Sequence, residues 1–173
     1  MTHEVTTALT AINLEAPVVV QCHTVVLASQ AAVWRVLTDF GRWPQWLPEV
    51  SRAELLDPLG PGARVRVETC GLVTVAKLTT VVPQEYLGWI EGSTGIRAVQ
   101  AWRLRTVHGA VLVTAEESWE GQMVSDYPGT LTRGLRACVT DWLSRLKRRS
   151  ERQDLGDPHH HAQAAGGLLT VRD

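Results

Sequence analysis

Hydrophobic and polar residues alternate along most of the middle of this chain, and a period of two is typical of strands buried on one face. Short stretches rich in turn-forming residues separate the runs: "DPLGPG", "GL", "PQE", "GSTG" and "VHG". Such short connections favour an antiparallel meander. An earlier run, Val18–Leu27, follows Pro17 and is also predicted as a strand. The predicted strands of the meander are Ser51–Leu56, Ala63–Cys70, Val73–Val82, Tyr86–Glu91, Ile96–Thr106 and Ala110–Gly121.

Between the first strand and the meander, the apolar period becomes helical. Ser29 is a suitable N-cap for this helix, and Gly41 is expected to end it. In the next segment, Pro44 and Pro48 fix the backbone around bulky tryptophans, which predicts a short turn that closes one end of the core. The apolar positions of the helix are Ala32, Val33, Val36, Leu37 and Phe40.

A second helical pattern follows the meander. Its apolar residues are spaced by four, three, four and four, which places them on one stripe of a helix from about Gly129 to Arg149. The sheet is the only large apolar surface that can bury this stripe, so we expect the helix to lie on it. The stripe consists of Leu131, Leu135, Cys138, Trp142 and Leu146.

Neither end of the chain has a sustained period. The sequence predicts an N-terminal extension over residues 1–17, one folded domain over 18–151 and a disordered tail over 152–173. With 173 residues and 45% hydrophobic content, the chain has enough apolar material for a single core. The tail's "HHH" at positions 159–161 lacks a fixed fold and a fourth ligand, so we assign no metal site.

Charge and cysteine content narrow the classes of function. The 17 basic and 18 acidic residues are well mixed, so no overall field attracts nucleic acid or an anionic membrane. The three cysteines lie far apart and form no CxxC, which favours a reducing compartment. No segment has the pattern of a signal peptide or of a bilayer span, and no nucleotide or zinc motif occurs. We therefore expect a cytoplasmic protein without membrane insertion and without a cofactor.

Two local motifs resemble a known superfamily. The segment "ASQAAVWRVLTDFGRWPQWLPEV" resembles the pattern A-P-x-x-x-V-W-x-x-L-x-D-x-x-x-x-x-x-W-x-P, and "EESWEG" resembles E-x-[FW]-x-G before the last helix. These patterns are similar to those of the START/Bet v 1-like (SRPBCC) superfamily, in its bacterial polyketide cyclase/dehydrase-like branch. "LSRLKRRSE" matches a third, weaker pattern, and Ser29 stands where the family usually has proline. The resemblance covers about Val18 to Glu151.

The resemblance implies an α+β helix-grip fold. In this fold a curved, seven-stranded antiparallel sheet wraps around the long C-terminal helix. The seven strands predicted above agree with this number. A short helical pair follows the first strand, and a ligand cavity lies between sheet and helix. Superfamily members include lipid and hormone carriers, quinone-binding proteins, polyketide aromatases and cyclases, and proteins with no known ligand. The fold alone therefore does not identify the function.

Strand alternation gives a second view of the cavity, because successive side chains point to opposite faces. Arg97, Arg103 and Arg105 then face water. The alternation around Lys77 is ambiguous, and we place it outside because burying it is costly. For the first strand, the family's register selects the face of Val26. The inward sets are Val20, Cys22, Thr24 and Val26; Val65, Val67 and Thr69; Leu87, Trp89 and Glu91; Ala98, Gln100, Trp102 and Leu104; and Val111, Val113, Ala115, Glu117 and Trp119.

Glu117 stands on an otherwise apolar face, and several interpretations are open. It is a structural carboxylate bonded to Gln100, a hydroxyl or backbone amides, or a bulge near Gly121 turns it back to water. Alternatively it anchors a ligand without chemistry, or its apolar surroundings raise its pKa so that it exchanges protons with a bound carbonyl compound.

The other polar and aromatic candidates also have more than one reading. Glu91 lies near a strand end, where an exposed rim position is favoured over a ligand contact. The inward tryptophans either stack on a ligand or fill the core. His23 and His108 are expected in solvent, and Tyr127 is expected to anchor the entry into the last helix.

The inferred lining of apolar walls with sparse polar anchors is typical of a small-molecule site. Our leading hypothesis is a cyclase, aromatase or dehydratase that acts on a hydrophobic, polyketide-like substrate without a cofactor or metal. Glu117 serves as acid or base and Gln100 orients a substrate oxygen. The residues expected to bind the ligand are Thr24, Val65, Val67, Thr69, Trp89, Glu91, Trp102, Trp119, Leu135, Cys138 and Trp142.

A rival hypothesis is a carrier or sensor of a lipid, quinone or aromatic metabolite, with no turnover. A third is an interaction module with a solid core. The expected partner is a hydrophobic small-molecule substrate or ligand, and no nucleic acid is expected to bind. Val25 and Leu27 on the outer face are compatible with a monomer or a homodimer.

Overall fold

The structure, a computed structural model, describes residues 11–93 and 95–155. Within these residues, seven strands form one antiparallel sheet in the order β1-β7-β6-β5-β4-β3-β2. Neighbours from β2 to β7 are consecutive in sequence, so the predicted meander is confirmed. Every strand end lies within two residues of the prediction. The strands are β1 (Val18–Val26), β2 (Val50–Leu55), β3 (Arg64–Thr69), β4 (Leu72–Val82), β5 (Tyr86–Ser93), β6 (Ile96–Val107) and β7 (Ala110–Glu120).

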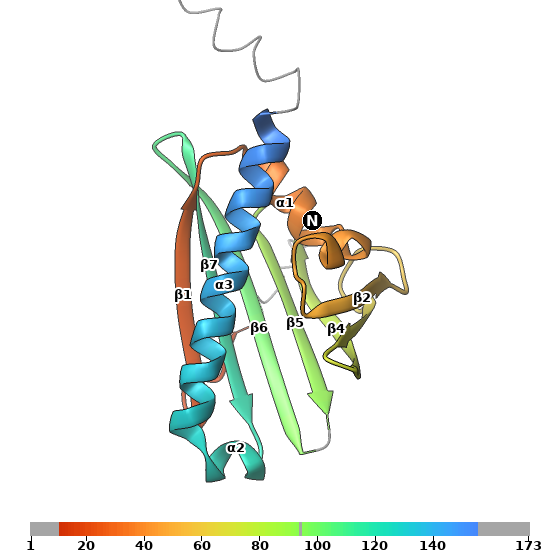
Figure 1. The fold of residues 1–173 in the computed structure, drawn as a ribbon, viewed down its shortest axis with the longest axis vertical. Coiled ribbons are helices and arrows are strands. Elements are labelled where there is room, and N and C mark those ends of the chain that lie inside the picture. Colours follow the sequence, from red (N-terminus) through yellow and green to blue (C-terminus); the bar gives the residue numbers. More distant parts are fainter. Residues whose placement is uncertain (1–10, 94, 156–173) are drawn as a thin grey trace, which may run out of the picture.

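The helices lie on one side of the sheet. The helices are α1 (Gln30–Thr38), the 3-10 helix η1 (Phe40–Gln45), α2 (Gln122–Asp126) and α3 (Pro128–Leu155). The long α3 crosses the sheet, with α1 near its C-terminal end and α2 at its N-terminal end (Figure 1). The chain therefore has the helix-grip α+β fold predicted from its sequence.

The first helix ends earlier than predicted. α1 stops at Thr38, with Asp39 as its C-cap, so Phe40 and Gly41 belong to η1 instead. The indole Nε1 of Trp43 donates a hydrogen bond to the carbonyl of Leu37 at 3.1 Å, which satisfies a carbonyl left free at the end of the helix. The N-cap prediction is confirmed, since Ser29 Oγ accepts from the Ala32 amide at 3.2 Å.

The last helix is longer than predicted and buries a different stripe. It continues beyond Arg149 to Leu155, so residues 152–155 of the expected tail are helical. Tertiary bonds stabilise this end, because Asp154 accepts from the Ser29 hydroxyl at 2.7 Å and Glu151 from the Leu27 amide at 2.8 Å. The rest of the expected tail, 156–173, lies outside the described residues. The buried residues of α3 are Leu135, Val139, Leu143, Leu146 and Ser150.

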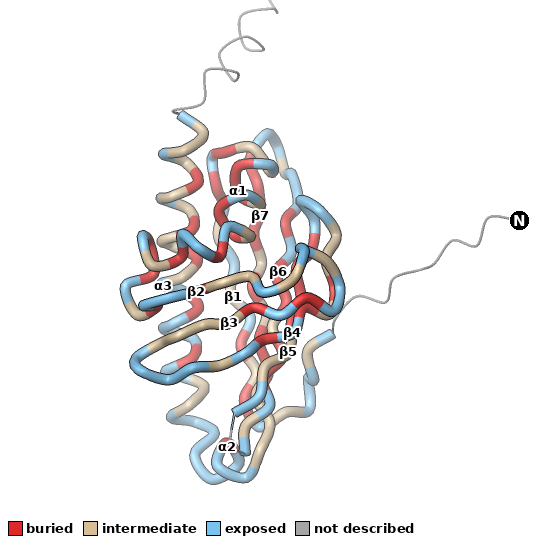
Figure 2. Tube along the Cα trace, turned by 90° about the vertical axis from the view of Figure 1, so that its right-hand side faces the viewer, coloured by how far each residue is buried: buried red, intermediate tan, exposed pale blue. Residues whose placement is uncertain are grey.

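The helix covers the sheet unevenly. It packs extensively on β1 and α1 and only slightly on β7. Buried positions of α1, α3 and the strands gather in the interior between them (Figure 2). Because α3 lies to one side, the inner faces of β3 to β6 are not filled by it. This asymmetry leaves room for a cavity.

Strand β7 is regular along its whole length. It pairs with β1 and β6 without a register shift, so Val20 and Gln100 flank Glu117 directly. The proposed bulge that would turn Glu117 to water is therefore wrong. Gly121 follows directly after the strand. Its φ is 137°, and a Cβ atom there would lie 1.8 Å from the Gly95 carbonyl oxygen. Only glycine allows the β5–β6 hairpin to approach this closely.

Part of the expected N-terminal extension contacts the sheet. The Asn13 amide donates to Ser118 Oγ at 3.0 Å, and its side-chain Nδ2 donates to Glu120 at 2.5 Å. Residues 1–10 of that extension are not among the described residues. Among the helices that the structure describes, none is long and apolar enough to span a membrane.

Candidate ligand-binding site

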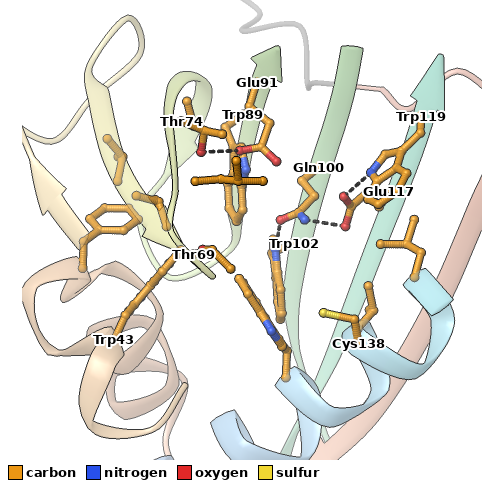
Figure 3. A pocket seen from close by; sticks show the side chains of 18 of the residues that line it. Trp43, Thr69, Thr74, Trp89, Glu91, Gln100, Trp102, Glu117, Trp119 and Cys138 are labelled. Carbon is orange, nitrogen blue, oxygen red and sulfur yellow. Dashed lines mark hydrogen bonds between the residues drawn. The ribbon is translucent and has the colours of Figure 1, made fainter. Parts of the chain in front are cut away.

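A cavity of about 360 Å³ opens between the sheet and α3. Its walls come from β3 to β7, η1 and α3, and polar groups are few (Figure 3). The described part of the chain therefore does not have the solid core that an interaction module requires. The predicted site residues that line the cavity are Val65, Val67, Thr69, Trp89, Glu91, Gln100, Trp102, Glu117, Trp119, Leu135, Cys138 and Trp142.

Thr24 does not line the cavity, and this prediction is wrong. Its side chain is on the inward face of β1, as alternation predicted, and it is half-buried. However, β1 is the strand on which α3 packs most extensively, so the helix occupies the space in front of Thr24. The alternation of a strand predicts on which face of the sheet a residue lies, but it does not show which element covers that face.

A chain of hydrogen bonds crosses the cavity wall and converges on Glu117. Trp102 Nε1 donates to Gln100 Oε1 at 3.3 Å, and Gln100 Nε2 donates to Glu117 Oε2. Trp119 Nε1 donates to Glu117 Oε1 at 2.6 Å. Register explains the arrangement, because Gln100 on β6 is directly opposite Glu117 on β7. Figure 3 shows both carboxyl oxygens of Glu117 engaged by N–H donors.

The surroundings of Glu117 favour its neutral form. The residue is 3% exposed, and burial raises the pKa of its carboxyl from 4.5 to about 8. The bond from Trp119 lowers this pKa, the charge of Glu91 raises it, and the bond from Gln100 lowers it. Below pH 8 the group carries a proton. Both known partners are donors, so no described group accepts that proton.

Glu91 is not the exposed rim residue that the sequence favoured. It is half-buried and lines the cavity, because β5 continues past it to Ser93. The Thr74 hydroxyl donates to its carboxylate at 3.5 Å. Burial is the larger effect and raises the pKa of Glu91, while the bond from Thr74 lowers it. The cavity therefore contains two carboxyl groups with different partners.

The tryptophans line the cavity and also pack in the hydrophobic core. Trp89 and Trp102 are stacked, with ring centroids 6.4 Å apart and planes 14° apart. Trp43 meets the ring of Trp142 edge-on at 5.6 Å and the ring of Trp89 at 6.4 Å. The rings of η1, the sheet and α3 therefore form one aromatic cluster, and the cavity borders it.

Several lining residues were not identified from the sequence. Those of β4 were missed because its alternation is ambiguous, although Lys77 is exposed as expected. Val139 was missed because the predicted stripe of α3 ran through Cys138 and Trp142 instead. Trp43 was expected only to close one end of the core. The lining residues missed are Phe40, Trp43, Cys70, Leu72, Thr74, Ala76, Leu78 and Val139.

Other groups considered from the sequence lie away from the cavity. His23 is exposed, and Tyr127 is exposed and does not contribute to the lining. All three cysteines are free thiols, and Cys70 and Cys138, unlike the two residues above, line the cavity. Within the described residues, no cluster of His, Cys, Asp and Glu side chains has the arrangement of a metal site.

Comparisons with known proteins agree with the fold. The family model described as "Polyketide cyclase / dehydrase and lipid transport" matches residues 17–151. No curated protein matches the chain. Among solved structures, hypothetical protein jhp0584 from Helicobacter pylori has a TM-score of 0.71 at 17% identity, over 83% of this chain and 98% of that chain.

Two further structures belong to biosynthetic systems. DynU16, a protein in the dynemicin biosynthetic locus, has a TM-score of 0.64 at 26% identity, over 79% of this chain and 48% of that chain. The di-domain ARO/CYC StfQ from the steffimycin biosynthetic pathway has a TM-score of 0.66 at 13% identity, over 82% of this chain and 54% of that chain. The present chain thus spans about half of each of these proteins.

Proposed function

Because the chain belongs to the polyketide cyclase/dehydrase and lipid transport family, we propose that its cavity binds a hydrophobic small molecule on which Glu117 performs acid/base catalysis. The finer assignment is a polyketide-like intermediate that undergoes cyclisation, aromatisation or dehydration. The occurrence of DynU16 and StfQ in biosynthetic systems supports this substrate class.

One observation carries the proposal: a buried carboxyl group lines the cavity, and both of its hydrogen-bond partners among the described residues are donors. Trp119 and Gln100 present N–H groups to Glu117, so they stabilise its charged form. Burial stabilises the neutral form and raises the pKa to about 8. Opposing effects of this kind bring the pKa of a carboxyl group near neutral pH, where acid/base catalysis is most effective.

The neutral form suits a carbonyl ligand. Since the proton of Glu117 has no acceptor among the described groups, the carbonyl oxygen of a ligand is a natural partner. Hydrogen bonding to that oxygen makes the adjacent C–H groups more acidic. In its carboxylate form, which the bonds from Trp119 and Gln100 stabilise, Glu117 accepts a proton from such a carbon. Glu117 then becomes neutral, and the negative charge passes to the enolate of the ligand.

The aromatic walls supply positioning. Trp89 and Trp102, which line the cavity with nearly parallel rings, are suited to contact a flat, conjugated skeleton. Holding a flexible precursor near its reactive shape lowers the entropy lost in ring closure.

The test is exchange of the acidic C–H hydrogens of 2-tetralone, a bicyclic ketone, for solvent deuterium, followed by NMR. The wild-type protein is expected to accelerate exchange, and Glu117→Gln to lower that acceleration by about 100-fold or more. The control is Glu116→Gln, because Glu116 precedes it on the opposite face of β7 and bonds Gln21. Unchanged exchange with Glu117→Gln contradicts the catalytic role.

A carrier without turnover is the second candidate. It is favoured by the fact that both oxygens of Glu117 already have partners, as in a purely structural network. Calorimetric binding of 2-tetralone without accelerated exchange identifies a carrier. Native mass spectrometry is then expected to show a hydrophobic ligand that is released unchanged.

A further inference from the structure

The polar groups of the cavity are unbalanced in charge. Its lining includes Glu91 and Glu117, and it contains no lysine, arginine or histidine from the described part of the chain. The remaining polar side chains of the wall are neutral hydroxyl, amide and thiol groups. The protein atoms of the wall therefore contribute either no net charge or a negative charge.

The thiol of Cys138 reports the same imbalance. Its pKa is raised to about 11, first by burial and then by the carboxylates of Glu117, Glu49 and Asp141, with a small contribution from Cys70. Every ionisable neighbour that raises this pKa is an acidic group. Because no basic side chain of the described residues lines the wall beside these acidic groups, the site disfavours fatty acids and other anionic ligands.

The aromatic walls also favour a cationic ligand over an anionic one. Five tryptophans line the cavity, and the face of an indole ring attracts cations more strongly than any other side-chain ring. Apolar walls alone are equally suited to a neutral hydrocarbon. Indole faces combined with carboxylates, however, form the arrangement by which proteins hold ammonium groups.

Glu91 is the carboxylate with capacity for such a group. Its one hydrogen bond to a described group comes from the Thr74 hydroxyl, at 3.5 Å, whereas a carboxylate can accept about four. The residue also borders a second, smaller pocket of about 120 Å³, which it shares with Thr74 and Trp119. Glu117, by contrast, has both oxygens engaged by Trp119 and Gln100.

We infer that the ligand of the cavity carries a basic nitrogen, and that this nitrogen binds as a cation at Glu91 beside the indole rings of Trp89 and Trp119. The inference rests on the proposed small-molecule function and names the chemical class of the ligand, a hydrophobic aromatic amine. The aromatic skeleton lies in the main cavity, and a carbonyl group on that skeleton can still meet Glu117.

Three probes of one size separate charge from hydrophobicity: 2-(2-naphthyl)ethylamine is a cation at neutral pH, 2-(2-naphthyl)ethanol is neutral, and 2-naphthylacetate is an anion. Isothermal titration calorimetry of the full chain measures their affinities. The wild-type protein is expected to bind the amine about tenfold more tightly than the alcohol, and the anion most weakly.

Glu91→Gln is expected to bring the amine and the alcohol to similar affinities. Glu91→Leu provides a second uncharged variant. The matched control is Glu85→Gln, which removes the same charge from an exposed residue between β4 and β5 and is expected to keep the preference.

The outcomes separate this inference from the proposed function. Equal binding of amine and alcohol to the wild-type protein overturns the amine assignment, while the 2-tetralone exchange still tests Glu117 independently. A preference for the amine that survives Glu91→Gln and Glu91→Leu overturns the role of Glu91. Failure of all three probes and of 2-tetralone to bind contradicts both proposals.

Discussion

Strands β1 and β3 have the same inward alternation and different surroundings. The inward valines of β1, among them Val18 and Val20, are fully buried. On β3, Val67 and Thr69 are only half-buried and line the cavity. The difference arises from α3, which packs extensively on β1 and lies across the cavity from β3. The packed half thus contributes to stability, and the open half provides binding surface.

The largest expected contrast is between two leucines. Leu146 on α3 is fully buried, whereas Leu72 on β4 is 71% exposed at the cavity edge. Leu146→Ala is expected to lower the free energy of unfolding by about 3 kcal/mol, since it leaves a void in the packed half. Leu72→Ala is expected to change it by less than about 0.5 kcal/mol. Urea unfolding followed by circular dichroism measures both. Equal losses contradict the contrast.

Two alanines test the difference between the packed and the open half by adding side-chain volume instead of removing it. Ala115 on β7 and Ala76 on β4 are both buried, but only Ala76 lines the cavity. Ala115→Phe is expected to cost about 2 kcal/mol because its surroundings are filled. Ala76→Phe is expected to cost less than about 1 kcal/mol and to abolish calorimetric binding of the naphthyl probes, because the ring enters the empty space. A larger loss for Ala76→Phe would show that the cavity is not available to a side chain.

Glu117 lines the cavity and stands on β7, which pairs with β1 of the packed half. Its contribution to the free energy of unfolding depends on pH. Its pKa is raised from 4.5 to about 8 in the folded protein, so between these values the folded state binds a proton that the unfolded state has lost. Stability therefore falls as pH rises through this range. From pH 6 to pH 9 the wild-type protein is expected to lose about 3 kcal/mol, since pH 6 lies two units below the folded-state pKa of about 8 and each unit corresponds to about 1.4 kcal/mol.

The same titration of Glu117→Gln provides the comparison. The variant cannot ionise at this position, so its unfolding free energy is expected to depend less on pH over the same range. At low pH it is expected to be the less stable protein, because an amide cannot accept from both Trp119 and Gln100 without facing one N–H group with another. Parallel pH profiles for the two proteins would exclude a raised pKa at Glu117.

The smallest expected effect compares two serines. Ser29 caps α1 and bonds Asp154 at the end of α3, whereas the hydroxyl of the exposed Ser51 on β2 donates to the Glu68 carbonyl. Ser29→Ala is expected to lower the free energy of unfolding by about 1 kcal/mol. Ser51→Ala is expected to leave it nearly unchanged in the same thermal unfolding measurement. The reverse order is inconsistent with the cap.

The fold and much of the cavity were predictable because both depend on local periodicity. Alternation alone placed Gln100, Trp102 and Glu117 on the inward face, and their cross-strand register followed from short turns. Thr24 was misplaced because alternation contains no information on the helix that covers β1. Val139 was missed because neighbouring positions of a helix face sheet and cavity at different angles, and only packing decides between them.

The chemistry of the carboxyl groups was less accessible to sequence reasoning. The engagement of Glu117 by Trp119 and Gln100 depends on side-chain geometry, and the sequence left four readings open. Glu91 was expected at an exposed rim, since the extension of β5 to Ser93 depends on pairing with β6. The elements that enclose Glu91, with Thr74 on β4 and Trp119 on β7, come from distant parts of the chain, and the local pattern of β5 does not reveal them.

The clustering of indoles gives the protein a built-in optical reporter. Five of its seven tryptophans, all within the described residues, line the cavity, so most of its fluorescent indoles lie close to a bound ligand. A ligand that displaces water from these rings is expected to shift the emission to shorter wavelengths without any added label. Trp89 and Trp102, nearly parallel at 6.4 Å, are close enough for their excited states to couple, which makes their circular dichroism sensitive to a molecule beside them.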